Sequence, residues 1–390
     1  MSPLSTTNFS HTKGNWTNHS DYEVDFTIDN DDLELSKFSE KIHIINNSGW
    51  ADLRSAGKCN GNGTYSNPYV IKDLVIDGNN SGDCILIENS SVFFRIENCT
   101  LKNSKDNWFY AGIRLYNTTN GILVNNTCSY NEAGITLWES DNNLVIGNKL
   151  SSNWDYGVFL IYSNNNTLIA NNATNHHWGG IWLEEKCNKN TISENIINGG
   201  DNIGIVLSRD SNHNFVSNNK LNNIDGTGIG LIRNYNNTVS GNKINNNKEA
   251  GIWLIYSNNN TILENDVNYN NYDGISLYIS DYNSISGNYI SNNIRDGISF
   301  DTSNNNSVIG NEVNYNSNGI LLKSSNYNNI SENLLKGNIK CIYEINCIGN
   351  FLENNDCRMQ NAIPGFNLLL LLCIFSAIAL LIIKKIISKS

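Results

Sequence analysis

The stretch GIWLIYSNNNTILENDVNYNNYD, residues 251–273, contains the pattern that decides the fold. A glycine is followed by alternating apolar residues, then by Ser and Asn, and the alternation returns around Ile262 and Val267. The same unit recurs along most of the chain, with steps of 22 to 24 residues between its glycines. These landmark glycines are Gly112, Gly134, Gly157, Gly180, Gly204, Gly228, Gly251, Gly274, Gly297 and Gly319. A constant period of this length is typical of a solenoid in which each repeat forms one coil.

A column of asparagines keeps the same period. Its members are Asn143, Asn166, Asn190, Asn214, Asn237, Asn260, Asn283, Asn306 and Asn328. Asn tolerates the left-handed backbone conformation of a sharp corner, and identical Asn side chains one coil apart can hydrogen-bond along the stack. We therefore expect a structural role for this column. The glycines are expected at another corner, where a Cβ would crowd the bend.

The apolar residues predict strands rather than helices. Ile252 and Leu254 alternate with outward positions, which is the period of a half-buried strand. No stretch before residue 362 has ten or more residues of helical period with caps. Each coil is expected to hold about three short strands, each pairing with its copy about 4.8 Å away. The sequence thus predicts an all-β, single-stranded parallel β-helix of about 12 coils with 22–24 residues each.

The chain divides into six predicted segments. They are a disordered segment at 1–21, an N-terminal cap at 22–69, the β-helix at 70–357, a linker at 358–366, a transmembrane helix at 367–384 and a basic tail at 385–390. Within the cap, residues 41–46 are strand-like and Trp50–Arg54 are expected to form a short helix.

Composition excludes several classes of function. The net charge of −11 argues against nucleic-acid binding, and no P-loop or dinucleotide-binding motif is present. Eight cysteines lie outside the C-terminal apolar run and gather toward the two ends of the repeat region, which predicts disulfides that staple the caps of an exported protein. They are Cys59, Cys84, Cys99, Cys128, Cys187, Cys341, Cys347 and Cys357.

The C-terminal tail predicts membrane attachment. An apolar run from Leu368 to Ile383 precedes Lys384 and Lys385, a pattern that favours a single span with the lysines in the cytoplasm and the β-helix outside. About 16 N-x-[ST] sequons permit glycosylation there. Residues 1–20 carry no apolar segment, so a cytoplasmic, tail-anchored protein is the alternative.

The repeat Gly-Ile-x-Leu-x-x-Ser-x-Asn-Asn-x-Ile-x-x-Asn resembles the right-handed parallel β-helix families, in particular NosD-like repeats, over residues 60–357. The resemblance implies a right-handed helix. NosD itself is a periplasmic, copper-binding accessory protein of nitrous oxide reductase maturation, although many members share only the repeat. The tail, with Pro364-Gly365-Phe366, resembles archaeal surface-protein sorting signals, but it lacks their usual Thr-rich spacer.

Strand alternation sends the first and third residues after each glycine inward and the second and fourth outward. Outward aromatic residues gather in the early coils, among Asn and acidic residues. Such a surface suits sugar rings, whose apolar faces are ringed by hydroxyl groups. The alternative is that these rings only cover the sheet. The predicted ligand-binding residues are Trp138, Trp154, Tyr156, Tyr162, Trp178 and Trp182.

Carboxylates converge in the later coils. Asp273 and Asp296 each precede a landmark glycine and should stack one coil apart, with Arg295 and Asp301 nearby. A carboxylate pair suits a glycosidase, and carboxylates that hold calcium beside a base suit a lyase. The same residues equally suit a charge-compensated surface column. These four residues are therefore catalytic candidates only.

Copper requires imidazole or soft ligands, and His176-His177 is the only pair of adjacent histidines. Asp201 and Asp225 are predicted in the same column as His177, so His177 and Asp201 are the candidate metal ligands. Adjacent strand residues point to opposite faces, which makes His176-His177 a poor chelate. We assign no cofactor and keep calcium and copper as alternatives.

The sequence thus predicts a membrane-anchored, cell-surface β-helix protein with a non-enzymatic binding or scaffolding role toward glycans or surface proteins. A polysaccharide lyase or glycoside hydrolase is the first alternative, and a copper-handling accessory protein is the second.

Overall fold

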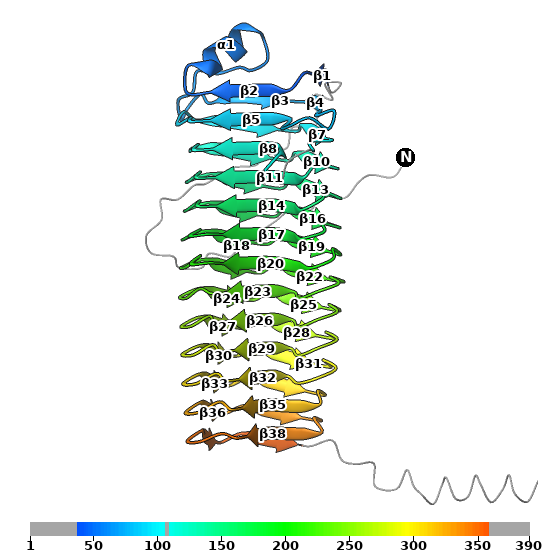
Figure 1. Cartoon of the computed structure of the whole chain (residues 1–390), viewed down its shortest axis with the longest axis vertical. Coiled ribbons are helices and arrows are strands. Elements are labelled where there is room, and N and C mark those ends of the chain that lie inside the picture. The colour runs from blue at the N-terminus through cyan, green and yellow to red at the C-terminus, as the bar shows by residue number, and fades with distance from the viewer. Residues whose placement is uncertain (1–36, 106–108, 359–390) are drawn as a thin grey trace, which may run out of the picture. The chain divides into compact units, whose positions relative to one another are not determined.

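The computed structural model describes residues 37–105 and 109–358, which form a stack of parallel coils (Figure 1). Each coil adds one strand to each of three parallel sheets, which hold 14, 13 and 13 strands and are named sheets A, B and C. The chain runs from sheet B to sheet C and then to sheet A before it enters the next coil. The predicted right-handed parallel β-helix is confirmed.

Sheet A contains β1 (Lys37–Ser39), β4 (Leu74–Asp77), β7 (Thr100–Lys102), β10 (Thr127–Ser129), β13 (Lys149–Ser151), β16 (Asn172–Thr174), β19 (Ile196–Asn198), β22 (Lys220–Asn222), β25 (Lys243–Asn245), β28 (Asp266–Asn268), β31 (Tyr289–Ser291), β34 (Glu312–Asn314), β37 (Leu334–Lys336) and β40 (Asp356–Arg358).

Sheet B contains β2 (Ile42–Ile45), β5 (Ile85–Glu88), β8 (Ala111–Tyr116), β11 (Ala133–Trp138), β14 (Tyr156–Ile161), β17 (Gly179–Glu184), β20 (Ile203–Ser208), β23 (Ile229–Ile232), β26 (Ile252–Ile255), β29 (Ile275–Tyr278), β32 (Ile298–Asp301), β35 (Asn318–Lys323) and β38 (Lys340–Ile345).

Sheet C contains β3 (Tyr69–Lys72), β6 (Phe94–Glu97), β9 (Gly121–Val124), β12 (Leu144–Ile146), β15 (Thr167–Ile169), β18 (Thr191–Ser193), β21 (Phe215–Ser217), β24 (Thr238–Ser240), β27 (Thr261–Leu263), β30 (Ser284–Ser286), β33 (Ser307–Ile309), β36 (Asn329–Ser331) and β39 (Phe351–Glu353).

The apolar columns of the sequence form the core. In the coil that opens with Gly251, the side chains of Ile252, Leu254, Ile262 and Val267 are all fully buried. Each pairs in register with the equivalent residue of the next coil, so like residues stack upon one another. Burial of each such side chain contributes about 1.5–3 kcal/mol, which makes these columns the main source of stability.

The predicted asparagine column forms a buried hydrogen-bonded ladder at the corner between sheets B and C. Asn283 shows its bonds: the backbone N–H donates to Asn306 Oδ1 at 2.7 Å, and Nδ2 donates to the Ser257 carbonyl of the coil before at 2.9 Å. Asn283 Oδ1 in turn accepts the N–H of Asn260 at 2.8 Å. The side chain thus joins its coil to the one before, and the backbone N–H of the same residue joins it to the one after.

Two further asparagine ladders occupy the other two corners and were not predicted. The ladder between sheets C and A contains Asn126, Asn148, Asn171, Asn195, Asn219, Asn242, Asn265, Asn288, Asn311 and Asn333, all buried. The ladder between sheets A and B contains Asn131, Asn153, Asn247, Asn270, Asn293, Asn316 and Asn338. In the three coils between Asn153 and Asn247, its positions hold His176, Gly200 and Ile224.

We predicted that the asparagines of the column that begins with Asn143 take the left-handed backbone conformation, and this is wrong. The left-handed conformation belongs to the residue before each column member, as at Asn259 and Asn305, both with φ of 55°. The column asparagines themselves have no positive φ. Their residue type is therefore required for hydrogen bonding, and the preceding residue takes the bend.

The predicted reason for the glycine column also needs correction. A Cβ on Gly251 would lie 2.2 Å from Cγ1 of Val267 and 2.7 Å from the carbonyl oxygen of Gly274 in the next coil. Gly251 and Gly274 do not have positive φ values. The column is thus required by close packing between coils and against the core, rather than by a bend.

Strand pairing begins before residue 70, where we expected the β-helix to start. Strands β1 and β2 pair in parallel with β4 and β5. The expected strand and helix of the cap correspond to β2 and to α1 (Gly49–Ser55). From α1, the buried Trp50 stacks on Tyr69, with ring centroids 5.1 Å apart, and closes this end of the core.

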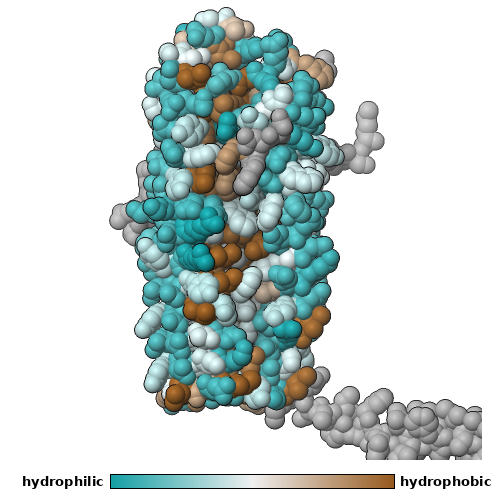
Figure 2. All heavy atoms as spheres, viewed as in Figure 1, coloured by the Kyte–Doolittle hydropathy of each residue, from teal (hydrophilic) through white to brown (hydrophobic). Residues whose placement is uncertain are grey.

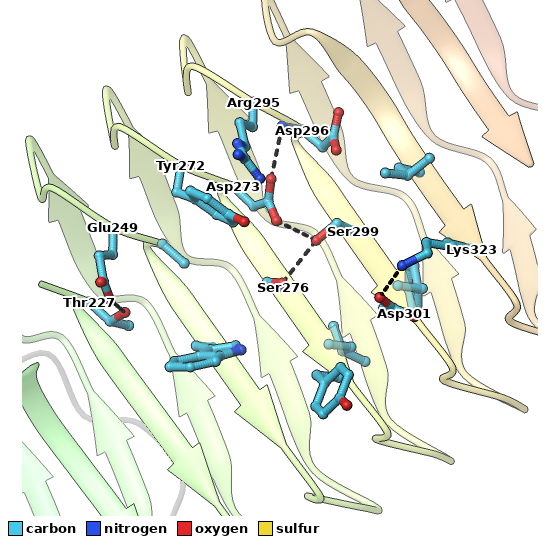
Figure 3. Close-up of a pocket in the computed structure, with 16 residues that line it drawn as sticks. Thr227, Glu249, Tyr272, Asp273, Ser276, Arg295, Asp296, Ser299, Asp301 and Lys323 are labelled. Atoms are coloured by element: carbon cyan, nitrogen blue, oxygen red, sulfur yellow. Dashed lines mark hydrogen bonds and ion pairs between the residues drawn. The ribbon is translucent and has the colours of Figure 1, made fainter. Parts of the chain in front are cut away.

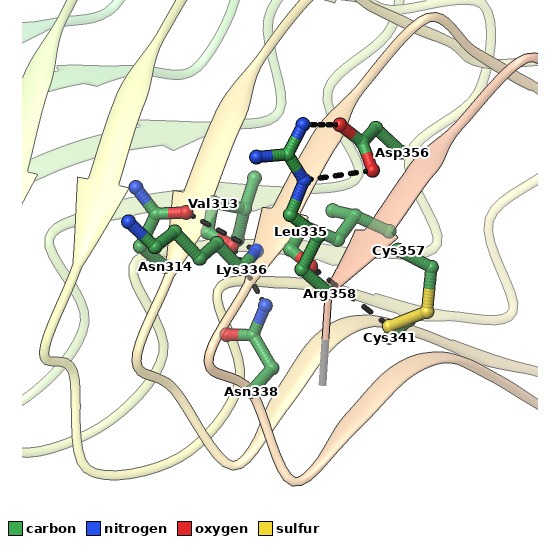
Figure 4. Close-up of a disulfide and its surroundings, with 9 residues drawn as sticks. All are labelled: Val313, Asn314, Leu335, Lys336, Asn338, Cys341, Asp356, Cys357 and Arg358. Atoms are coloured by element: carbon green, nitrogen blue, oxygen red, sulfur yellow. Dashed lines mark hydrogen bonds and ion pairs between the residues drawn. A yellow bond between two sulfur atoms is a disulfide. The ribbon is translucent and has the colours of Figure 1, made fainter. Parts of the chain in front are cut away.

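Only one end carries a disulfide among the described residues. Cys341, in the register of the glycine column, bonds to Cys357 of β40 and staples the last coil, as predicted (Figure 4). The staple predicted for the N-terminal end is wrong, because Cys59, Cys84 and Cys99 are free and buried. Burial raises the pKa of Cys84 to about 12, so this thiol serves as a neutral core side chain.

Within residues 37–105 and 109–358, no helix is long and apolar enough to cross a bilayer. The expected transmembrane helix at 367–384 lies outside the described residues, as do the segment at 1–21, the Pro364-Gly365-Phe366 motif and the basic tail at 385–390.

Removing one rung of a ladder tests its contribution. Asn265 Nδ2 donates to the Val239 carbonyl at 2.9 Å, and its Oδ1 accepts the N–H of Asn242 at 3.0 Å. Asn265→Ala leaves both groups buried without partners and should lower the free energy of unfolding by about 3 kcal/mol. The control is Asn271→Ala, at an exposed position, which should change it by less than about 0.5 kcal/mol in urea titrations. Equal effects of the two variants would contradict a stabilising ladder.

Candidate functional site

The outer face of sheet B carries aromatic, aliphatic and charged side chains. As predicted, in β8 the residues Ile113 and Leu115 are buried, whereas Arg114 and Tyr116 point outward. Figure 2 shows apolar residues in a band along this face, between hydrophilic margins. Outward-facing apolar residues of the sheet include Phe159, Ile161, Trp182, Val206, Ile232, Ile255 and Leu321.

In the later coils this face is hollowed into a groove of about 550 Å³, which we call the sheet B groove (Figure 3). It crosses β26, β29, β32 and β35. The starts of the coils contribute Thr227, Glu249, Tyr272, Asp273, Arg295 and Asp296; the strand centres contribute Trp253, Ser276, Ser299 and Leu321; the strand ends contribute Tyr278, Asp301 and Lys323.

Asp273 is held by a network of hydroxyl and backbone donors. The Ser299 hydroxyl donates to Asp273 Oδ2 at 2.6 Å, and the backbone N–H of Asp296 donates to Oδ1 at 3.1 Å. Ser276 Oγ lies 2.9 Å from Ser299 Oγ, so Ser276 donates to Ser299, whose single proton is used on Asp273. Burial raises the pKa of Asp273, and the nearby carboxylate of Asp296 raises it further.

Asp296 stacks one coil beyond Asp273, as the sequence predicted. Its Oδ1 accepts hydrogen bonds from Asn318 of β35, from the backbone N–H at 3.1 Å and from Nδ2 at 2.6 Å. Asp296 is 8 % exposed and lines the groove. Among the described residues, no protein group donates to its second oxygen, Oδ2.

The other two catalytic candidates, Asp301 and Arg295, also line the groove, but each already contacts another side chain of the protein. Asp301 pairs with Lys323 at 2.7 Å. The Arg295 guanidinium lies 3.8 Å from the centroid of the Tyr272 ring, in a cation–π contact. The structure thus brings Asp273, Asp296, Asp301 and Arg295 together.

Sequence reasoning did not single out Trp253, Glu249, Tyr272 or the two serines of the groove. The signal was present in the repeat, because Trp253, Ser276 and Ser299 occupy the same position in successive coils, two residues after the landmark glycine. Reading that column along the chain would have placed an indole beside two hydroxyls.

The six predicted ligand-binding aromatics fall into three groups in the early coils. Tyr156 and Trp182 contact each other on the outer face of sheet B, with ring centroids 5.5 Å apart. Trp138 packs against Tyr116 on the same face. Three are exposed at the strand margins: Trp154 by 61 %, Trp178 by 45 % and Tyr162 by 41 %. The rings at the strand margins are exposed and those on the sheet face are half-buried, so ring surface is available to a ligand.

A pair of carboxyl groups that we did not predict lies beside these rings. Glu132 and Asp155 are one coil apart, and the Asp155 N–H donates to the Glu132 carbonyl at 2.7 Å. Burial raises the pKa of Asp155 to about 6, partly opposed by His177. Burial and the charge of Asp155 also raise the pKa of Glu132.

The candidate metal ligands form a pair and not a larger cluster. His177 Nδ1 lies 2.7 Å from Asp201 Oδ2, as the predicted column implied, whereas Asp225 pairs with Lys248. His176 points to the opposite side and is 2 % exposed. No group of three or more His, Cys, Asp or Glu able to hold a metal occurs within the part of the chain that the structure describes. Two donors, one of them a carboxylate, do not fit a copper site.

Two family models match parts of this chain. The right-handed β-helix region model matches residues 58–221, and the model of the periplasmic copper-binding protein NosD matches residues 204–313. No curated protein matches the sequence. Together with the parallel solenoid, the two matches support a right-handed β-helix that is similar to NosD over residues 204–313.

Solved structures with a similar fold include alginate-modifying enzymes. The A-module of the Azotobacter vinelandii mannuronan C-5 epimerase AlgE6 gives a TM-score of 0.59 at 14 % identity, over 80 % of this chain and 93 % of that chain. A double mutant of the periplasmic alginate epimerase AlgG gives 0.52 at 17 % identity, over 73 % and 76 %. At these identities the similarity concerns the fold alone.

The raised pKa of Asp155 predicts a pH-dependent effect on stability. The pKa rises from 3.8 to about 6 on folding, so the folded protein binds this proton more tightly, and stability falls as pH rises through that window. Asp155→Asn should therefore stabilise the protein at neutral pH, and the gain should vanish in acid below the lower value.

This effect is measured as the difference in unfolding free energy between the Asp155→Asn variant and the parent protein at each pH. Burial lowers the pKa of His176 from 6.5 to about 4, which makes stability rise with pH in nearly the same range and opposes Asp155. His176 is present in both proteins, so its contribution cancels in the difference between their urea unfolding free energies. A difference independent of pH would contradict the assignment to Asp155.

Proposed function

We propose that this chain is a membrane-anchored, cell-surface protein that binds glycans along the outer face of sheet B without transforming them. The observation that carries the proposal is the sheet B groove, which combines an indole, two phenol rings, hydroxyls and carboxyl groups on one rigid face (Figure 3). Sugars present apolar ring faces and a belt of hydroxyls, and this combination of side chains is complementary to both.

The spacing of the coils also favours a repeating ligand. Equivalent positions in neighbouring strands lie about 4.8 Å apart, a distance comparable to the length of one sugar unit. Trp253, Ser276 and Ser299 repeat at this spacing in the groove, and Trp138 and Trp182 occur on the same face in earlier coils. An extended polysaccharide lying along the stack would meet one coil per sugar.

The similar solved structures include enzymes that epimerise alginate, a polysaccharide, so this fold is compatible with polysaccharide ligands. Their low identity transfers no residue role to this chain.

Catalysis by Asp273 and Asp296 is the alternative that one observation favours, since burial and mutual repulsion raise the pKa of one carboxyl beside the other. Binding is preferred because both oxygens of Asp273 already accept protein hydrogen bonds, and a general acid or base must reach the substrate proton. Release of reducing or unsaturated sugar that Asp273→Asn abolishes would establish the enzyme.

The membrane anchor in the proposal rests on the apolar run from Leu368 to Ile383 and the lysines after it. Two arginines within the run, Leu372→Arg and Ile378→Arg, each oppose insertion by about 2.5–3.5 kcal/mol. The double variant should move from the carbonate-resistant membrane fraction to the soluble fraction. Retention in the membrane would contradict anchoring by this segment.

Trp253 tests the glycan-binding face directly. Trp253→Ala removes the indole at the strand centre of the groove and should weaken the binding of any glycan selected on an array by at least about tenfold, or ~1.4 kcal/mol. The matched control is Tyr289→Ala on sheet A, an aromatic residue 43 % exposed on a different face, which should leave affinity unchanged by calorimetry. Equal losses in both variants, or none in either, would exclude the groove as the binding site.

A further inference from the structure

The lining of the sheet B groove contains more acidic than basic residues. Its lining includes four acidic residues, Glu249, Asp273, Asp296 and Asp301, and two basic residues, Arg295 and Lys323 (Figure 3). Both basic side chains are already engaged. Lys323 pairs with Asp301, and the Arg295 guanidinium lies over Tyr272.

Three acidic residues thus have no ion-pair partner among the described residues. Glu249 has one neutral partner, since the Thr227 hydroxyl donates to its Oε2 at 3.2 Å. Asp273 and Asp296 accept only from serine, amide and backbone groups. They come from three successive coils, so the uncompensated carboxyl groups follow the axis of the groove.

Asp296 is the most informative of the three. It is more than nine-tenths buried, and Asn318 satisfies only Oδ1. Oδ2 receives no hydrogen bond from a described protein group and is open to the groove that Asp296 lines. A carboxylate in such a partly desolvated position is stabilised by a charged donor. The groove is therefore complementary to a ligand that brings its own positively charged donors.

We propose that the sheet B groove selects glycans that carry protonated amino groups, as in polymers of hexosamine, and discriminates against uronate polymers. This inference rests on the proposed glycan binding and names its ligand class. An ammonium group would donate to Asp296 Oδ2, and further amines one sugar apart would lie near Asp273 and Glu249. A uronate carboxylate would instead meet like charge in a partly desolvated groove, which is strongly unfavourable.

Three oligosaccharide probes of equal length test this selectivity by calorimetry. Chitosan oligomers carry amines, chitin oligomers are their neutral N-acetylated counterparts, and oligoalginate carries carboxylates. In mildly acidic buffer, where the amines are protonated, chitosan should bind at least about tenfold more tightly than chitin, and alginate should bind most weakly. The chitosan preference should shrink as salt is added, because added salt screens charges near the surface.

Charge-neutral variants assign the preference to residues. Asp296→Asn and Glu249→Gln should each lower the ratio of chitosan affinity to chitin affinity several-fold. Glu312→Gln is the matched control, because Glu312 is exposed on the outer face of sheet A and should affect no probe. Thermal melting of each variant confirms that the fold is retained.

The outcomes separate this inference from the function on which it rests. If chitin binds as tightly as chitosan, or if alginate binds most tightly, and Trp253→Ala abolishes that binding, the amine selectivity is wrong. Glycan binding by the groove then still holds. Chitosan binding that Trp253→Ala leaves unchanged but high salt abolishes would reflect the net negative charge of the protein and overturn both.

Discussion

The register of the coils, and with it the surface, depends on one interaction, the hydrogen bonding of buried asparagines to the coils on either side. Some backbone groups at a corner, such as the N–H of Asn260, bond to a side chain and not to the backbone of the next coil, and burying such a group unpaired would cost about 1–3 kcal/mol. Asn can donate and accept from the same short side chain, as Asn283 does toward Ser257 and Asn260. Aspartate could only accept. Three corners per coil explain why Asn is so abundant.

This interaction also fixes the register, and the register creates the surface. Because each asparagine bonds to its own copy, coils cannot slip, and every position in the repeat becomes a file of side chains along the stack. The inward files vary little, since they must pack against identical neighbours. The outward columns of side chains are free to vary. On sheet B one such column holds the large Trp253 and then the small Ser276 and Ser299 in the next two coils, which leaves space for the groove.

This division explains what could be predicted from the sequence. The strands, the inward direction of Ile252 and Leu254 and the stacking of Asp296 on Asp273 follow from period and position alone. The engagement of Arg295 by Tyr272 depends on side-chain conformations that no repeat encodes. The N-terminal cysteines were misjudged for a similar reason, because Cys84 and Cys99 fill core positions in their coils and do not face one another as a bonded pair. Asn265 and Asn270 also belong to columns that repeat with the same period in the sequence, but the prediction considered only the first asparagine column.

A frame of this kind has consequences for binding. Ladders and paired strands hold the groove side chains on a scaffold that does not have to be ordered by the ligand, so association loses less conformational entropy than it would on loops. Each coil contributes only a few contacts, and those contacts recur at the strand spacing. Useful affinity therefore requires a ligand that is itself extended and periodic. A long polymer meets that requirement better than a single small molecule, and the uncompensated Glu249, Asp273 and Asp296 in successive coils then determine which charge the polymer carries.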